Sequence, residues 1–279
     1  MRTTGADSER IETAFFQFDV LPATGRYEIK DKQGQVVWKS NPDHARFGEA
    51  TFNVSGKPKR IPLKHCETKR VENGLELTFH PLADKPEALL RVLVRPANDG
   101  KVLEFSFAAA EDLPLESIRL LDDAFWVTEA EKGYVIVPVR EGLLVPADSG
   151  LAFTNRFDTY AYEGCHMAML GVVKDGSAAL LTWDDPYVVA ELKSALTDTP
   201  PTRGKQALAP SLMLRKSAKA FRVQFLGRGD YVTIAKAYRD LAKQRGWLET
   251  WDEKLKGHPE RAKYFGASNY KLWSTLDRA

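Results

Sequence analysis

The sequence lacks a long apolar run and an excess of charge of either sign. No stretch approaches the about 18 consecutive apolar residues of a membrane-spanning helix, and the N-terminus has no apolar segment typical of a signal peptide. The 40 Lys and Arg residues nearly balance the 38 Asp and Glu residues, so no strong field attracts nucleic acid or an anionic membrane. We therefore expect neither partner. The compartment stays open: cytoplasmic, or secreted or periplasmic if a signal peptide has been removed.

Cysteine is scarce and the familiar catalytic motifs are missing. The two cysteines, Cys66 and Cys165, do not make a disulfide framework; two free thiols are the simpler interpretation, and a single bond between them stays open. Each has a neighbouring histidine, but adjacent residues of a strand point to opposite faces, which disfavours a zinc site. There is no glycine-rich phosphate loop, no Gly-x-Ser-x-Gly and no His-Glu-x-x-His. We expect no metal and no cofactor.

What the sequence has in quantity is alternation of apolar and polar residues. The alternation is clear over residues 16–20, 75–80 and 103–107, and it predicts half-buried strands. A hairpin is expected over residues 26–38, with Gly34 taking a positive φ in its turn. Residues 39–62 are rich in Pro, Gly, Asn and Lys and predict a long loop with at most one short strand. Roughly twelve to sixteen short strands with frequent turn signals predict a mainly β, antiparallel sandwich.

One amphipathic helix follows this β region. Its apolar residues recur with helical spacing over residues 231–245, Asp230 is a good N-cap, and Gly246 is a good stop signal. We expect a β-supersandwich domain over residues 1–228, and a linker helix with an aromatic-rich tail over residues 229–279. The tail carries six large aromatic residues, which are Trp247, Trp251, Tyr264, Phe265, Tyr270 and Trp273.

A first candidate carbohydrate-binding cluster is Trp183-Asp184-Asp185. An indole ring can cover the apolar face of a sugar while carboxylates accept hydrogen bonds from its hydroxyl groups. The alternative is a buried tryptophan followed by a turn that an aspartate caps, and the sequence favours this second interpretation.

A second candidate cluster mixes charged, polar and aromatic groups in an expected loop. Its members are Arg156, Asp158, Tyr160, Tyr162, Glu163 and His166. Such a mixture suits a ligand groove. A solvated connection between strands explains the same composition and stays open.

Several segments resemble the galactose mutarotase-like β-supersandwich. They are residues 18–20 with 24–31, 102–107, 133–138 and 141–146. Residues 229–239 resemble the linker helix that joins such a sandwich to a catalytic barrel in glycoside hydrolases related to endo-α-N-acetylgalactosaminidase. The resemblance implies a (β/α)₈ barrel C-terminal to this chain, and it implies that the catalytic carboxylates lie on that barrel. Mutarotases use a His and a Glu, but no such pair is matched in this sequence, so no catalytic residue is carried over.

The leading hypothesis is an accessory, non-catalytic β-sandwich domain of a carbohydrate-active glycoside hydrolase, with carbohydrate as a partner. The first alternative is a self-contained sugar epimerase or polysaccharide lyase that uses His166, Glu163, Arg156 and Asp158. The second alternative is a structural or interaction module without a ligand. The absence of a polar, aromatic-lined cleft would favour the third.

Overall fold

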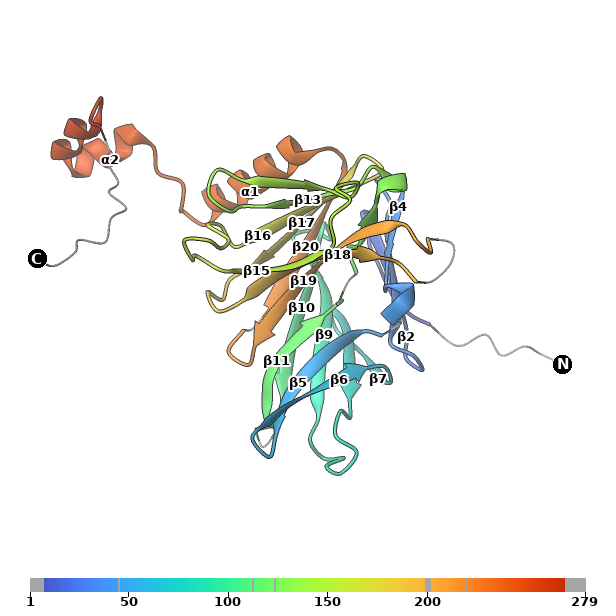
Figure 1. Ribbon diagram of the computed structural model, residues 1–279. Coiled ribbons are helices and arrows are strands. Elements are labelled where there is room, and N and C mark those ends of the chain that lie inside the picture. The colour runs from blue at the N-terminus through green and yellow to red at the C-terminus, as the bar shows by residue number, and fades with distance from the viewer. Residues whose placement is uncertain are drawn as a thin grey trace, which may run out of the picture. The chain divides into compact units, whose positions relative to one another are not determined.

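The computed structural model describes residues 8–44, 46–111, 113–122, 124–198, 202–218 and 220–268 (Figure 1). The chain divides into two compact units, Met1–Ala237 and Tyr238–Ala279. The boundary after residue 228 that the sequence suggested stays a prediction. Within the described ranges, no helix is both long enough and apolar enough to cross a membrane.

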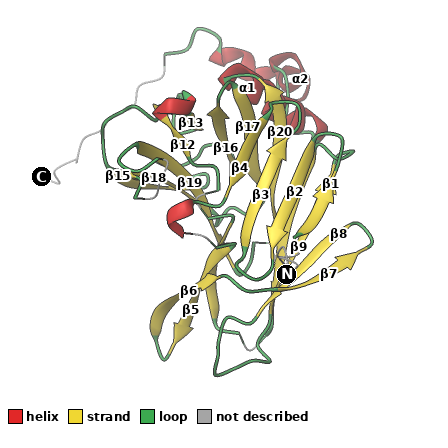
Figure 2. Ribbon diagram, turned by 90° about the vertical axis from the view of Figure 1, so that its right-hand side faces the viewer, coloured by secondary structure: helices red, strands yellow, loops and turns green. Residues whose placement is uncertain are grey.

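Three sheets, with every strand pair antiparallel, make up most of the first unit (Figures 1 and 2). The four-stranded sheet has the order β1 (Glu9–Glu12), β2 (Phe16–Leu21), β3 (Arg26–Asp31) and β4 (Val36–Lys39). The nine-stranded sheet has the order β14 (Leu143–Pro146), β13 (Tyr134–Val137), β16 (Met169–Lys174), β17 (Ser177–Trp183), β20 (Ala220–Arg228), β10 (Val102–Ala109), β9 (Leu90–Ala97), β8 (Gly74–Phe79) and β7 (Glu67–Val71).

The seven-stranded sheet carries the candidate site described below. Its order is β15 (Phe153–Asp158), β18 (Val189–Leu196), β19 (Gln206–Arg215), β11 (Leu115–Leu120), β5 (Gly48–Val54) and β6 (Lys57–Leu63), and β12 (Val127–Thr128) pairs with β19. Short 3₁₀ helices lie at Pro42–His44, Glu129–Glu131 and Pro259–Tyr264. The prediction of a mainly β, antiparallel sandwich is confirmed.

One continuous apolar core joins the three sheets. Phe16 and Phe18 of β2 contact Phe225 and Phe105 of the nine-stranded sheet, with ring centroids 5.3 and 6.0 Å apart. The inward residues of the seven-stranded sheet, such as Leu120, belong to the same buried cluster. Because period-two alternation puts apolar side chains on one face of each strand, the opposite faces of the sheets are left for polar groups.

The predicted helix is confirmed as α1 (Tyr231–Gln244). Asp230 caps it, since its Oδ1 accepts hydrogen bonds from the backbone N–H groups of Val232 (3.0 Å) and Thr233 (3.2 Å). Ile234 is buried against β16, where a Cβ at Gly171 would lie 3.0 Å from its methyl carbons. The absence of a side chain at Gly171 therefore lets the first turns of α1 dock on the nine-stranded sheet.

The second unit contains α2 (Trp251–Gly257), which begins with a capping box formed by Thr250 and Glu253. Within this unit the ring centroids of Trp251 and Phe265 are 5.3 Å apart. Tyr270 and Trp273 of the expected aromatic tail lie outside the described residues.

The expectation of a long loop over residues 39–62 is wrong, because β5 and β6 form a hairpin there. The composition misled because β6 contains Pro58 and Pro62, which rarely occur inside a sheet. As the last strand in the order, β6 leaves one side of its backbone unpaired, and prolines are tolerated at such an edge.

The conformation expected for Gly34 is also wrong, since the positive φ of that turn belongs to Gln35 (φ 58°). Gly34 is needed for close packing instead. Its N–H donates to Asp31 Oδ1 (2.9 Å), and a Cβ at this position would lie 1.8 Å from Ser177 Oγ.

Candidate functional site

Two members of the first candidate cluster have structural roles at the end of β17 and in the turn that follows it. Trp183 ends β17, is 1% exposed, and donates a hydrogen bond from Nε1 to Thr159 Oγ1 (2.9 Å). A ring so enclosed offers no face on which a sugar could stack. Asp185 Oδ1 accepts from the backbone N–H of Tyr187 (2.7 Å), which is the capping role of the alternative interpretation.

The third member, Asp184, belongs to a ladder of charges across the outer face of the nine-stranded sheet. Its Oδ2 accepts from Arg222 Nη1 (2.6 Å), and Arg222 Nε donates to the buried Glu104 (2.7 Å). Arg95 Nε donates to the same carboxylate (2.7 Å). Every member of this ladder has a charged partner at hydrogen-bond distance. We therefore interpret the ladder as a structural element rather than a binding site.

Most of the second cluster lies on a loop that folds back on the end of β15. The backbone N–H of Cys165 donates to Asp158 O (3.0 Å), and that of Tyr160 donates to Cys165 O (2.7 Å). The His166 ring has Nε2 at 3.0 Å from the carbonyl oxygen of Tyr162. The loop is therefore held largely by its own backbone.

Arg140 holds the tip of this loop. Its guanidinium pairs with Glu163 and lies 5.2 Å from the centroid of the Tyr162 ring. The carboxylate of Glu163 raises the pKa of Arg140. Among the described residues, no hydrogen bond or ion pair joins the side chains of Glu163 and His166 to those of Arg156 and Asp158. The structure thus divides the cluster into a loop group and a strand group.

The strand group lies on the outer face of the seven-stranded sheet. Arg156 of β15 stands opposite Glu191 of β18, and its Nε donates to Glu191 Oε2 (2.7 Å). On β11, Ile118 enters the core, so its neighbour Arg119 is on the outer face, where it stands opposite Glu49 of β5. A second row on this face contains Arg215, Ser117, Thr51 and Arg60, which the register pairs strand by strand.

A cavity of about 420 Å³ opens on this face, within the size range of small-molecule sites. Its lining residues come from β5, β6, β11, β15 and β19. They are Thr51, Pro58, Arg60, Glu116, Ser117, Arg119, Arg156, Met213 and Arg215. The lining thus holds four arginines against one glutamate.

Arg119 is the distinctive residue of the cavity because it is buried and poorly paired. It is 5% exposed, and a guanidinium has five N–H donors to satisfy. Its Nη2 donates to Glu191 Oε2 at 3.4 Å, its Nη1 lies 3.8 Å from Glu49 Oε1, and its Nε has no partner within the described ranges. Both contacts are longer than a well-formed charge-assisted hydrogen bond of about 2.7–2.9 Å.

Both neighbouring carboxylates have nearer cations than Arg119. Glu49 is 3.0 Å from Arg46 Nη1, and Glu191 is 2.7 Å from Arg156 Nε. The exposed Arg215 has no side-chain partner in the part of the chain that the structure describes. The face therefore has cationic donors in excess of the acceptors that reach them.

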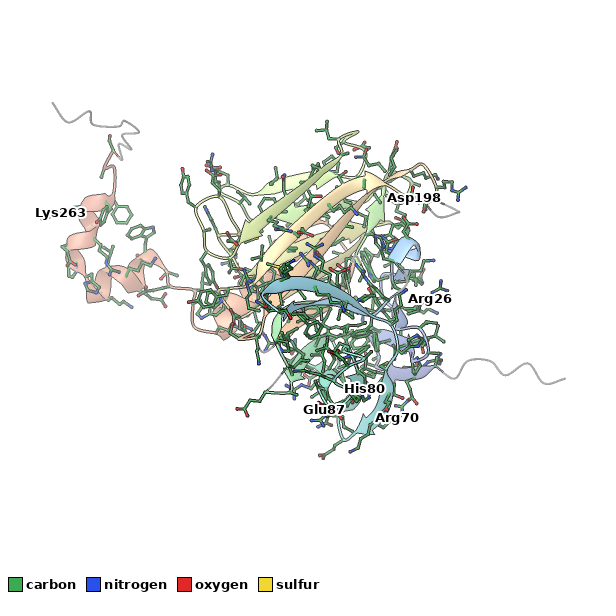
Figure 3. The ribbon with its side chains drawn as sticks, turned by 60° about the horizontal axis from the view of Figure 1, so that its bottom comes forward. Arg26, Arg70, His80, Glu87, Asp198 and Lys263 are labelled. Atoms are coloured by element: carbon green, nitrogen blue, oxygen red, sulfur yellow. The ribbon has the colours of Figure 1, made fainter. Side chains whose placement is uncertain are left out.

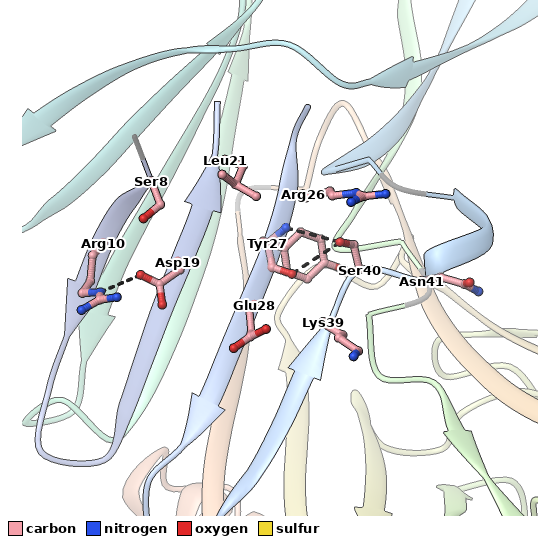
Figure 4. Close-up of a pocket in the computed structure, with 10 residues that line it drawn as sticks. All are labelled: Ser8, Arg10, Asp19, Leu21, Arg26, Tyr27, Glu28, Lys39, Ser40 and Asn41. Carbon is pink, nitrogen blue, oxygen red and sulfur yellow. Dashed lines mark hydrogen bonds and ion pairs between the residues drawn. The ribbon is translucent and has the colours of Figure 1, made fainter. Parts of the chain in front are cut away.

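A larger cavity, of about 540 Å³, lies on the outer face of the four-stranded sheet (Figure 4). Arg10 Nε donates to Asp19 Oδ1 (2.6 Å) across its floor, and Ser40 Oγ accepts from the backbone N–H of Tyr27 (3.3 Å). Arg10 is thus paired with Asp19, and Glu28 stands opposite Lys39 on the neighbouring strand, so size alone does not make this cavity the better candidate.

A third cavity, of about 410 Å³, contains Lys174, but this buried ammonium is well satisfied. Lys174 Nζ is 2.9 Å from Glu131 Oε1 and donates to Val37 O (3.1 Å). It also lies 5.6 and 5.4 Å from the ring centroids of Trp38 and Trp126. Lys174 is thus a structural cation that ties β16 to β4.

His80, labelled in Figure 3, follows β8, and its Nε2 is 3.5 Å from Glu67 Oε1. The residues lining the Arg119 cavity include no histidine. Across the described residues, no group of three or more His, Cys, Asp or Glu side chains could hold a metal ion.

Sequence reasoning found Arg156 and missed the other members of the cavity. Glu49 and Arg60 fell in the expected loop. Arg119 stands between the apolar residues Ile118 and Leu120, and a charged residue inside such an apolar run was the available signal.

No protein-family model matches the chain, and no curated protein matches it. Solved structures do match. The α-N-acetylgalactosaminidase NagBb from Bifidobacterium bifidum, in complex with Gal-NHAc-DNJ, aligns with a TM-score of 0.70 at 13% identity, over 92% of this chain and 42% of that one. Its GalNAc complex aligns with a TM-score of 0.68 at 13% identity, over 90% of this chain and 41% of that one.

A weaker match, with a TM-score of 0.42 at 11% identity, is a galactose mutarotase related enzyme from Lactobacillus acidophilus, over 80% of this chain and 99% of that one. The match to the α-N-acetylgalactosaminidase shows that this chain shares the fold of a part of that enzyme, and it confirms the fold expected from the sequence resemblance. This chain spans 42% of the length of that enzyme.

Proposed function

We propose that this chain is an accessory, non-catalytic β-supersandwich domain of a carbohydrate-active glycoside hydrolase. It supports a catalytic (β/α)₈ barrel, and the outer face of its seven-stranded sheet contributes to glycan binding. The observation that carries the proposal is the alignment of 92% of this chain with less than half of an α-N-acetylgalactosaminidase. The rest of that enzyme, more than half of its length, is large enough for a second domain.

The cavity on the seven-stranded sheet supports the glycan part of the proposal. Carbohydrates are recognised by convergent polar groups in a shallow cleft, and planar guanidinium groups and hydroxyls are suitable donors. Arg156 and Asp158, chosen from the sequence, alternate with the buried Phe157 and so share the outer face with Arg119. These two residues stay carbohydrate-binding candidates, whereas Trp183 and Asp185 do not.

An activity assay tests the accessory role. We expect the purified chain to release no product from aryl glycosides, including an aryl α-N-acetylgalactosaminide, because the described residues that line its cavity include one carboxylate, Glu116, where glycoside hydrolysis uses two. Turnover that co-purifies with the chain and is lost in the Arg119→Gln variant would contradict a non-catalytic role.

The barrel is tested in the native organism. An antibody raised against this chain should detect a protein much larger than 279 residues. A native product of 279 residues would refute the multidomain proposal. Glycan-array binding by the isolated chain tests the remaining part, and the absence of binding to every glycan would refute the glycan role.

A further inference from the structure

We propose that the cavity around Arg119 selects acidic glycans, and that a carboxylate or sulfate group of the sugar pairs with the Arg119 guanidinium. This inference rests on the proposed function, since it presumes that the outer face of the seven-stranded sheet binds glycan. It goes further by naming the class of sugar and the residue that reads its charge.

Arg119 is buried without enough hydrogen-bond acceptors. A buried guanidinium that makes one hydrogen bond of 3.4 Å, with Nε unpartnered among the described residues, keeps most of the desolvation cost of burial without the compensating contacts. An anion in the cavity supplies the missing acceptors. A carboxylate or sulfate fits best, because two of its oxygens match the fork of N–H donors on a guanidinium.

The groups around Arg119 add further positive charge to the cavity. Arg60, Arg156 and Arg215 line the same cavity, and Arg60 and Arg156 are more than half exposed at the side chain (62% and 56%). Glu49 and Glu191 are already paired with Arg46 and Arg156. An anion therefore approaches through exposed arginines toward a buried one, and this arrangement concentrates negative ligands.

The other lining groups suit the hydroxyl groups of a sugar rather than its apolar face. The lining includes the hydroxyl groups of Ser117 and Thr51, which suit sugar hydroxyls, and the residues described there include no aromatic ring. A neutral sugar usually gains much of its affinity by stacking on such a ring. Recognition in this cavity therefore depends on charge and hydrogen bonds, and this favours an acidic sugar over a neutral one.

Calorimetric titration of the full chain at low salt tests the proposal with matched probes. The first pair is trigalacturonic acid and its fully methyl-esterified form, in which methyl ester groups replace the charged carboxylates. The second pair is galactose 6-sulfate and galactose, and sodium sulfate alone is the third arm. We expect an acidic probe to bind at least about tenfold more tightly than its neutral partner and more tightly than sulfate, with an affinity that falls as salt is added.

Three variants locate the binding. Arg119→Gln removes the buried cation, and Arg215→Gln removes an exposed one whose loss leaves the fold intact. Arg91→Gln is the matched control, because Arg91 is an exposed strand arginine on β9 of another sheet, without a side-chain partner in the described ranges. We expect binding of the acidic probe to weaken about tenfold or more in the first variant, severalfold in the second, and not in the control.

Other outcomes would refute either the acidic-glycan site or the glycan-binding role. Equal affinity for acidic and neutral probes, or unchanged binding in Arg215→Gln and Arg119→Gln, refutes the acidic-glycan site and leaves the proposed function standing. Sulfate binding as tight as that of the sugars shows an inorganic anion site instead. No binding of any glycan, acidic or neutral, refutes the glycan role itself.

Discussion

The outer faces of the two large sheets carry the same residue types in different states of pairing. On the nine-stranded sheet, Glu104 is held by Arg95 and Arg222, both at 2.7 Å, and Arg222 also reaches Asp184 at 2.6 Å. On the seven-stranded sheet, the contacts of Arg119 with carboxylates are 3.4 and 3.8 Å long.

The difference separates a structural ladder from a binding site. In the ladder, every charge already has its counter-charge, so a ligand could bind only by breaking ion pairs. In the cavity, the arginines exceed the nearby acceptors, so a ligand adds contacts without removing any. Pairing, rather than the number of charged residues, is what distinguishes the two faces.

Among the substitutions on the two sheet faces, the largest effect is expected for Glu104→Gln, which breaks the ladder. This change leaves Arg222 with Asp184 only and Arg95 without a carboxylate, beside a site that is 5% exposed in the native protein. We expect the free energy of unfolding to fall by about 2 kcal/mol, less than for a fully buried pair because Arg95 is half exposed. Chemical denaturation measures it, and Glu76→Gln on the neighbouring β8 is the control. A change below that of the control would show that the ladder is not structural.

The next prediction concerns the pH dependence of stability, to which two free thiols contribute. Burial raises the pKa of the free Cys165 thiol to about 12 and that of the free Cys66 thiol to about 11. As pH rises past about 9, the unfolded thiols lose their protons first while the folded thiols retain them. The contribution of Cys165 to stability is therefore fully present below about pH 9 and is lost as pH rises towards about 12, by up to about 1.4 kcal/mol per pH unit.

Denaturation curves of the wild type and of Cys165→Ala between pH 8 and 10.5 check this expectation. The variant should lose less stability over that interval than the wild type. Equal slopes in both proteins would mean that Cys165 is not buried as a neutral thiol.

The smallest effect is expected for Arg119→Met, which replaces the buried cation by an apolar side chain of similar length. Glu49 and Glu191 keep Arg46 and Arg156 as partners, so no carboxylate is left alone. We expect a change in the free energy of unfolding below about 1 kcal/mol in either direction, while binding of the acidic probe is lost. A destabilisation larger than that of Glu104→Gln would show that Arg119 is structural and would reverse the comparison between the two faces.

Much of the fold could be predicted from local pattern alone. The alternation over residues 16–20 and the capped stripe over 231–245 specify β2 and α1, because each element buries one face and has its own end signals. The hairpin of β5 and β6 was missed because prolines at an edge strand look like a loop. The hairpin joins the seven-stranded sheet by pairing β5 with β11, a strand that lies more than fifty residues further along the chain.

The candidate site was harder to predict than the fold for the same reason. Arg156 was found because polar and aromatic residues are dense around it. The opposition of Arg119 to Glu49 depends on the register between β11 and β5, and no local pattern encodes a register between distant strands. The burial of Trp183 likewise depends on Thr159, which reaches it from another part of the chain.

The most direct test of the acidic-glycan site is the nuclear magnetic resonance signal of the Arg119 Nε–H group, which is assigned by its absence in Arg119→Met. If the Arg119 cavity binds acidic glycans, we expect this signal to move, and its exchange with water to slow, when trigalacturonic acid or galactose 6-sulfate is added. We expect no change in the signal of Arg91. The two neutral sugars should have no effect on the Arg119 signal. An Arg119 signal that does not respond to either acidic probe at saturating concentration would contradict the acidic-glycan site.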